Sequence, residues 1–278
     1  MLRTLGLALL CISAYFAYWF FMQRNLIYFP DRSKLDESLA KASGFTPIQL
    51  KTEDGLTLQA WYRPAKGQFW TLVYCHGNAG NIVGRVPLVE PYLELGYGVL
   101  LLEYRGYADN PGSPTQTGLM LDGVAALTYL QKEGVPLKQV ALMGESLGTG
   151  VVVHLAARYP VGAVILQSAY TSLVDLGLYH YPFLPVRWFL TDRYDSASEI
   201  TKIHAPILFL HGAYDAIVPI EMGHRLYELA PQPKQFVTQR GRGHNDLSSS
   251  DLVEEVTEFL KNSITKSPVP SSTHHPEI

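Results

Sequence analysis

The feature of this sequence that most restricts its fold is a regular alternation of short, almost wholly apolar runs with longer segments of helical periodicity. Residues 97–102, for example, have the uninterrupted apolar character of a strand buried on both faces. Strands that alternate with helices predict right-handed crossovers and a mostly parallel central sheet with helices on both faces. The expected strands of this sheet are 70–75, 97–102, 140–143, 163–166, 207–210 and 234–238, and the expected helices are 83–95, 115–131, 147–158, 220–229 and 252–260.

Three further segments complete the predicted domain, which spans 44–262. Residues 46–53 and 56–63 alternate like strands on either side of Asp54-Gly55, which predicts an antiparallel hairpin at one edge of the sheet. Residues 170–204 contain no clear strand but many aromatic side chains, which predicts a small helical lid rather than disorder. Residues 263–278 are rich in Pro, Ser and Thr, and we expect a disordered tail there.

The N-terminus poses a membrane question. Residues 4–22 carry no charged side chain, and 19 helical residues span about 28 Å, close to the hydrocarbon thickness of a bilayer. Residues 1–24 are therefore predicted to form a single-pass transmembrane helix that binds the lipid bilayer, flanked by Arg3 and Arg24 and followed by a juxtamembrane connector over 25–43. A cleaved signal peptide and a buried core helix are the alternatives, and the side of the membrane is undetermined.

Composition excludes several classes of protein. Lys and Arg (22) nearly balance Asp and Glu (25), for a net charge of −3, which argues against a nucleic-acid partner. The two cysteines, Cys11 and Cys75, cannot build a disulfide framework or a zinc site, and we expect no metal ion and no cofactor. The oligomeric state is not determined by these features.

A candidate nucleophile lies in Gly144-Glu145-Ser146-Leu147-Gly148, which fits the pattern G-x-S-x-G. An expected strand enters this segment and an expected helix leaves it, which is the strand–turn–helix setting of a nucleophile elbow. The glycines are needed because a Cβ atom at either flanking position would collide with the neighbouring strand or helix. We therefore predict that Ser146 is exposed at the carboxyl edge of the sheet.

A serine nucleophile needs a base and a group that orients the base. His244 follows the last expected strand, and Asp215 follows the strand at 207–210, so both lie at the same edge as Ser146. These three residues form the predicted catalytic triad. His76 and His211 end strands in His-Gly pairs, and we expect them to hold loops by hydrogen bonds.

The oxyanion of a tetrahedral intermediate needs two N–H donors. We predict the backbone N–H of Leu147, directly after the nucleophile, and that of Asn78 in the loop 76–81, with Ala79 as an alternative to Asn78. For the substrate pocket we predict aromatic lid residues, namely Tyr170, Tyr179, Phe183 and Trp188.

Six motifs in a fixed order resemble the α/β-hydrolase superfamily and, within it, the membrane-anchored Bem-like, abhydrolase-domain serine hydrolases. They are Leu26-Ile27-Tyr28-Phe29-Pro30, His76-Gly77-Asn78-Ala79-Gly80-Asn81, Tyr104-Arg105-Gly106-Tyr107, Gly144-Glu145-Ser146-Leu147-Gly148, His211-Gly212-x-x-Asp215 and Gly243-His244-Asn245-Asp246. The resemblance implies the α/β-hydrolase fold and intact triad positions.

The expected function is that of a membrane-anchored serine hydrolase that cleaves carboxylic esters or thioesters through an acyl-enzyme. The resemblance makes an acylated, lipid-like substrate plausible. An α/β-fold peptidase or a lysophospholipase is the alternative among enzymes. A catalytically silent membrane scaffold with the same fold is the alternative outside them.

Overall fold

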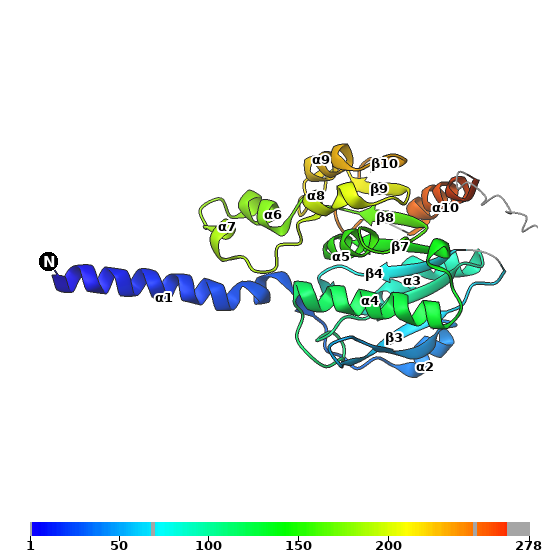
Figure 1. Cartoon of the computed structure of the whole chain (residues 1–278), viewed down its shortest axis with the longest axis horizontal. Helices are drawn as coiled ribbons and strands as arrows, with labels where there is room; N and C mark the ends of the chain where they lie inside the picture. The colour runs from blue at the N-terminus through cyan, green and yellow to red at the C-terminus, as the bar shows by residue number, and fades with distance from the viewer. Residues whose placement is uncertain (1, 68–69, 247–248, 266–278) are drawn as a thin grey trace, which may run out of the picture.

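The computed structural model describes residues 2–67, 70–246 and 249–265. An eight-stranded sheet has helices on both faces, and a long N-terminal helix extends away from it (Figure 1). All neighbouring strands are parallel except β3, which runs antiparallel to both β2 and β6. The predicted fold is confirmed. In sheet order the strands are β10 (Lys234–Gln239), β9 (Ile207–Gly212), β8 (Ala163–Gln167), β7 (Val140–Glu145), β4 (Thr71–Cys75), β6 (Gly98–Leu102), β3 (Thr57–Arg63) and β2 (Thr46–Lys51).

The apolar runs of the sequence form the centre of this sheet because they are covered on both faces. In β4, Val73 and Cys75 belong to one hydrophobic core, whereas Leu72 and Tyr74 belong to a second core on the opposite face. Helices α4 and α5 contact each other over the first core, and α3 contacts α10 over the second. The helices are α1 (Leu2–Ile27), α2 (Glu37–Ala42), α3 (Val86–Glu94), α4 (Gln116–Lys132), α5 (Leu147–Ala156), α6 (Leu173–His180), α7 (Val186–Phe189), α8 (Ser196–Glu199), α9 (Ile220–Leu229) and α10 (Ser249–Thr265).

Several details differ from the sequence predictions: α1 runs on to Ile27, past the predicted boundary at 24, and α2 lies within the predicted connector 25–43. Helix α10 continues to Thr265, so the first three residues of the predicted tail are helical, and 266–278 lie outside the described residues. A short parallel pair, β1 (Phe29–Pro30) with β5 (Ala79–Gly80), ties the segment after α1 to the loop after β4. That contact joins residues about 50 positions apart, and no local pattern in the sequence announces it.

The predicted lid consists of α6, α7 and α8, between β8 and β9. Helix α8 packs against α5 and α9, whereas α6 and α7 contact each other and project toward α1 (Figure 1). Helices α6 and α7 therefore form the part of the lid that covers the carboxyl edge of the sheet.

Candidate active site

Ser146 lies in the sharp turn between the end of β7 and the start of α5. Its backbone has φ = 49° and ψ = −116°, a conformation that residues with a side chain rarely adopt and that persists only where the surroundings enforce it. A Cβ atom at Gly144 would lie 2.7 Å from the carbonyl oxygen of Gly148, and one at Gly148 would overlap the carbonyl oxygen of Cys75. The two glycines therefore let the turn pack tightly against the helix and the neighbouring strand.

His244 lies in the loop between β10 and α10, where its ring meets the other two predicted residues. Its Nε2 is 3.0 Å from Ser146 Oγ, and its Nδ1 is 2.7 Å from Asp215 Oδ2. An ionised carboxylate can only accept hydrogen bonds, so Nδ1 carries the proton and Nε2 is left to accept from the serine hydroxyl. The structure thus brings together side chains that lie 98 and 29 positions apart in the chain.

Asp215 is enclosed in the turn that follows β9. Its Oδ1 accepts from the backbone N–H groups of Ile217 (3.0 Å) and Val218 (2.7 Å), while Oδ2 faces His244. Burial raises the pKa of Asp215, but the hydrogen bonds from His244 and Val218 outweigh it and hold the pKa below its ordinary value. His211 donates from Nε2 to the Val218 carbonyl at 2.9 Å, so this histidine fastens the turn, as predicted.

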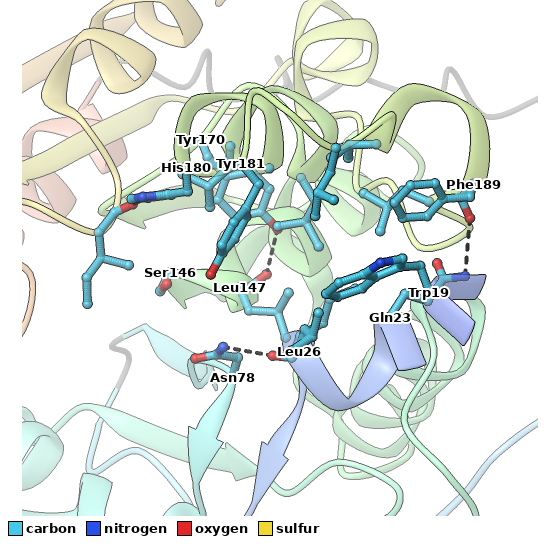
Figure 2. A pocket seen from close by; sticks show the side chains of 18 residues that line it. Trp19, Gln23, Leu26, Asn78, Ser146, Leu147, Tyr170, His180, Tyr181 and Phe189 are labelled. Carbon is cyan, nitrogen blue, oxygen red and sulfur yellow. Dashed lines mark hydrogen bonds between the residues drawn. The ribbon is translucent and has the colours of Figure 1, made fainter. Parts of the chain in front are cut away.

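Both predicted oxyanion donors belong to residues that border the same cavity as Ser146 (Figure 2). The N–H of Leu147 lies in the first turn of α5, where N–H groups have no acceptor within the helix. Asn78 lies in the loop after β4, on the opposite side of the cavity from the lid (Figure 2). Ala79, the alternative donor, begins β5.

Three hydrogen bonds of Asn78 help to hold the loop that carries it. The Asn78 carbonyl accepts from the Tyr107 hydroxyl at 2.7 Å and from the Phe29 N–H at 2.9 Å. The Asn78 side chain donates to the carbonyl of Ile27, at the end of α1, at 2.7 Å. His76, in the same loop, donates from Nδ1 to the Gly77 carbonyl at 2.7 Å, so the loop-holding role predicted for it is confirmed.

An ion pair that the sequence did not reveal lies beside this loop, where a Cβ atom at Gly77 would be 3.1 Å from Glu145 Oε1. Glu145, the second residue of the G-x-S-x-G motif, makes a bidentate pair with Arg85 at 3.0 and 3.1 Å and accepts from the Tyr74 hydroxyl at 3.0 Å. Burial opposes its charge, but Arg85 keeps the pKa of Glu145 below its ordinary value. The one signal in the sequence is a charged residue at the end of a buried strand, and nothing there links it to position 85.

A cavity of about 360 Å³ opens beside Ser146, between α6, α7 and the end of α1 (Figure 2). Most of its lining is aliphatic or aromatic, so it suits an apolar group better than a charged one. The lid contributes Leu173, Leu176, Gly177, His180, Tyr181, Leu184, Val186, Phe189 and Leu190.

The structure corrects most of the predicted pocket. Tyr170 lines the cavity, and its hydroxyl donates to the Leu147 carbonyl at 3.3 Å (Figure 2). Tyr179, Phe183 and Trp188 are 60%, 77% and 90% exposed, and they are not among the described residues that line the cavity. Helix α6 turns positions 173, 176, 177 and 180 toward the cavity, which leaves 179 on the outer face. An aromatic composition does not reveal which face of a short helix is buried.

The end of α1 supplies a wall of the cavity that was not predicted. Trp19, Gln23, Leu26 and Ile27 all line it. Within 2–67, 70–246 and 249–265, no helix is both long enough and apolar enough to cross a membrane, so the transmembrane anchor predicted over 1–24 is not supported. Arg24, predicted to flank this anchor, pairs with Asp192 of the lid at 3.0 Å.

Known proteins that are similar to this chain have the same fold. The α/β hydrolase fold family matches residues 71–199, and the TAP-like protein family matches 187–270. The crystal structure of Pyrococcus furiosus esterase Pf2001 superposes with a TM-score of 0.69 at 21% identity, covering 84% of this chain and 98% of that one. The class of protein is that of the α/β hydrolases.

Curated relatives narrow the family. Uncharacterized protein Rv2307c of Mycobacterium tuberculosis is 37% identical, covering 93% of this chain and 94% of its own length. Protein bem46 of Schizosaccharomyces pombe is 31% identical, with coverages of 92% and 90%. Lysophosphatidylserine lipase ABHD12 of Danio rerio is 31% identical over 67% of this chain and 59% of the relative. This chain belongs to the Bem-like branch of the α/β-hydrolase family and is a hydrolase.

Proposed function

We propose that this protein hydrolyses carboxylic esters or thioesters with an apolar acyl group, through an acyl-enzyme formed on Ser146. The observation that carries the proposal is the hydrogen-bonded series Asp215–His244–Ser146, whose serine borders a largely apolar cavity. Either half alone would be weaker support, because a relay without a cavity has no substrate and a cavity without a nucleophile has no chemistry.

In the first half-reaction, Ser146 Oγ attacks the acyl carbon while His244 Nε2 takes the hydroxyl proton. The bond from the acyl carbon to the leaving oxygen or sulfur then breaks, and His244 returns the proton to that atom. In the second half, His244 deprotonates a water whose oxygen attacks the acyl carbon. The bond from the acyl carbon to Ser146 Oγ then breaks, and His244 returns the proton to Oγ as the carboxylic acid leaves. Asp215, whose pKa is lowered, stays ionised and stabilises the imidazolium that forms in both halves.

The oxyanion of each tetrahedral intermediate is assigned to the N–H groups of Leu147 and Asn78. The hydrogen bonds of Asn78 to Tyr107, Phe29 and Ile27 support this assignment, because donors that are already fixed cost no reorganisation during the reaction.

A lysophospholipid is the second candidate substrate. It is a carboxylic ester with one acyl chain, and a relative is named as a lysophosphatidylserine lipase. The cavity lining gives the same support to a single acyl chain from any source.

The test combines a fluorophosphonate probe with hydrolysis of p-nitrophenyl butyrate. We expect the wild-type protein to be labelled and active, and Ser146→Ala and His244→Ala to lose labelling and at least about 10³-fold in kcat. Ser198→Ala, an exposed serine of α8, is the matched control and should behave like wild type.

The possible results of these measurements distinguish the candidate functions. Melting temperatures establish that the variants are folded. A folded wild-type protein that is neither labelled nor active would overturn the proposal and favour a silent scaffold. Faster turnover of lysophosphatidylserine than of the p-nitrophenyl ester would favour the second candidate. Turnover confined to aminoacyl anilides would favour a peptidase.

A further inference from the structure

The end of α1 presents one continuous face to the cavity. Its lining residues Trp19, Gln23, Leu26 and Ile27 are spaced by four, three and one positions, which places them on one side of an α-helix. Phe21, which lies between them in sequence, is 73% exposed. The cavity therefore has one wall that comes from outside the sheet and its connections.

Gln23 locks this wall to the lid. This residue is only 5% exposed, and its amide nitrogen donates to the carbonyls of Phe20 (2.7 Å) and Phe189 (3.2 Å). Its amide oxygen accepts from the backbone N–H (2.7 Å) and the hydroxyl (3.0 Å) of Thr191. Two donors and two acceptor positions are all that a glutamine side chain offers, so Gln23 is fully used. The wall and the second half of the lid are thus fixed relative to each other.

Trp19 lies at the far end of that wall from the nucleophile. The carbonyl of Ile27 is bonded by Asn78, beside Ser146, and eight residues of α-helix separate Trp19 from it by about 12 Å. Figure 2 shows the indole ring beside Phe189, across the cavity from Ser146. Tyr15 and Tyr18 contact the ring edge-on at centroid distances of 6.2 and 5.5 Å.

The indole N–H of Trp19 is enclosed and, among the described residues, has no hydrogen-bond partner. A buried donor without a partner costs free energy. The indole N–H therefore does not help to hold the ring in this place. The contacts of the indole ring with Tyr15 and Tyr18, and the fixed position of the helix, set where the ring lies. The large apolar ring then covers the end of the cavity.

We propose that Trp19 closes the distal end of the cavity and sets the longest apolar acyl chain that the protein accepts, with Gln23 holding the wall in place. This inference rests on the proposed ester hydrolysis. It makes Trp19 a specificity-determining residue that lies outside the sheet and the lid.

The test is a series of p-nitrophenyl esters from two to sixteen acyl carbons, measured on the full chain. Where the cavity accepts another methylene, kcat/KM rises by up to about fourfold. We expect Trp19→Ala to extend this rise to longer chains, so that the ratio of kcat/KM for the twelve-carbon over the four-carbon ester increases at least tenfold. Trp19→Phe should shift the limit less, because a second aromatic ring still fills the end. Phe21→Ala, on the exposed side of the same helix, should leave the profile unchanged.

Gln23→Leu tests the wall separately, because leucine fills similar space without the four hydrogen bonds. We expect the chain-length limit to become less sharp and the Thr191 amide to exchange its hydrogen faster. A chain-length profile of Trp19→Ala that matches wild type, in a protein whose hydrolysis depends on Ser146, would overturn this inference alone. Absence of any Ser146-dependent hydrolysis would instead overturn the proposed function.

Discussion

Asp215 illustrates how the surroundings of one residue decide its charge. Its carboxylate is buried, which by itself would favour the neutral form, yet two backbone N–H groups and the His244 ring point at it. The resulting pKa lies below the ordinary value of an aspartic acid. A partner that is charged at neutral pH keeps the imidazole in the tautomer that can accept a proton from serine.

The same shift predicts a dependence of stability on pH. Between the two pKa values the unfolded chain holds the Asp215 proton more tightly than the folded chain, so the free energy of unfolding rises with pH there. Asp215 therefore contributes stability above about pH 4, and this is lost as the pH falls through its folded pKa. The difference in free energy of unfolding between wild type and Asp215→Asn should be larger at pH 5 than at pH 2.5, measured by urea unfolding. A difference that grows toward acid would contradict the lowered pKa.

For single residues, the sequence allowed a prediction where a catalytic side chain comes directly after a strand. Ser146, Asp215 and His244 could be selected because parallel strands deliver their following loops to one edge. The pair of Arg85 with Glu145 could not, since it depends on how a loop folds back over 60 positions and has no characteristic spacing.

Among the elements, the short lid helices show the limit of reasoning from composition. The lid was expected to be helical because aromatic residues argue against disorder, and α6 and α7 are indeed helical. Which aromatic residues face inward depends on where each helix begins. Ser172 caps α6 by accepting from the Asp175 N–H, and that start fixes the face that meets the cavity.

This facing predicts different effects for two neighbouring side chains of α6. Leu176 lines the cavity and Tyr179 does not. Truncating leucine to alanine removes about three carbons of apolar contact, roughly 2 kcal/mol, so Leu176→Ala should raise KM for an eight-carbon ester about tenfold or more. Tyr179→Ala should leave KM within twofold of wild type. Steady-state kinetics of both variants provide the measurement, and equal effects would show that the helix faces are assigned incorrectly.

The packing of the last turns of the N-terminal helix could not be predicted, for a related physical reason. An apolar face is the same signal whether lipid or protein covers it, so the sequence of α1 could not show that its last turns pack against a lid more than 160 positions away. The buried amide of Gln23 within an apolar stretch was the one local indication, because a buried polar group needs partners.

For the whole molecule, the cavity requires parts of the chain that lie far apart in sequence. Removing residues 2–18 leaves Trp19, Gln23 and Arg24 in place, whereas removing 2–24 deletes them. The longer deletion leaves Asp192 buried without Arg24 and the Thr191 N–H without Gln23. We expect it to cost about 1–3 kcal/mol of stability and to lower the melting temperature by several degrees relative to the shorter one.

Hydrogen exchange locates the effect of that deletion. Backbone amides of 186–194 should exchange their hydrogens faster than in wild type in the longer deletion. In the shorter deletion their exchange rates should equal those of wild type. Identical melting and exchange in the two deletions would show that the end of α1 contributes nothing to the lid.

Because α1 reaches the cavity as an unbroken helix, its geometry imposes a rotational constraint on the chain. One residue inserted between Gln23 and Leu26 would turn everything upstream by about 100° and carry the indole out toward solvent, although every amino acid of the wall would still be present. Insertions in this stretch are therefore tolerated only when their length is close to a whole number of helical turns. Even these would move Trp19 along the cavity by about 1.5 Å for each added residue.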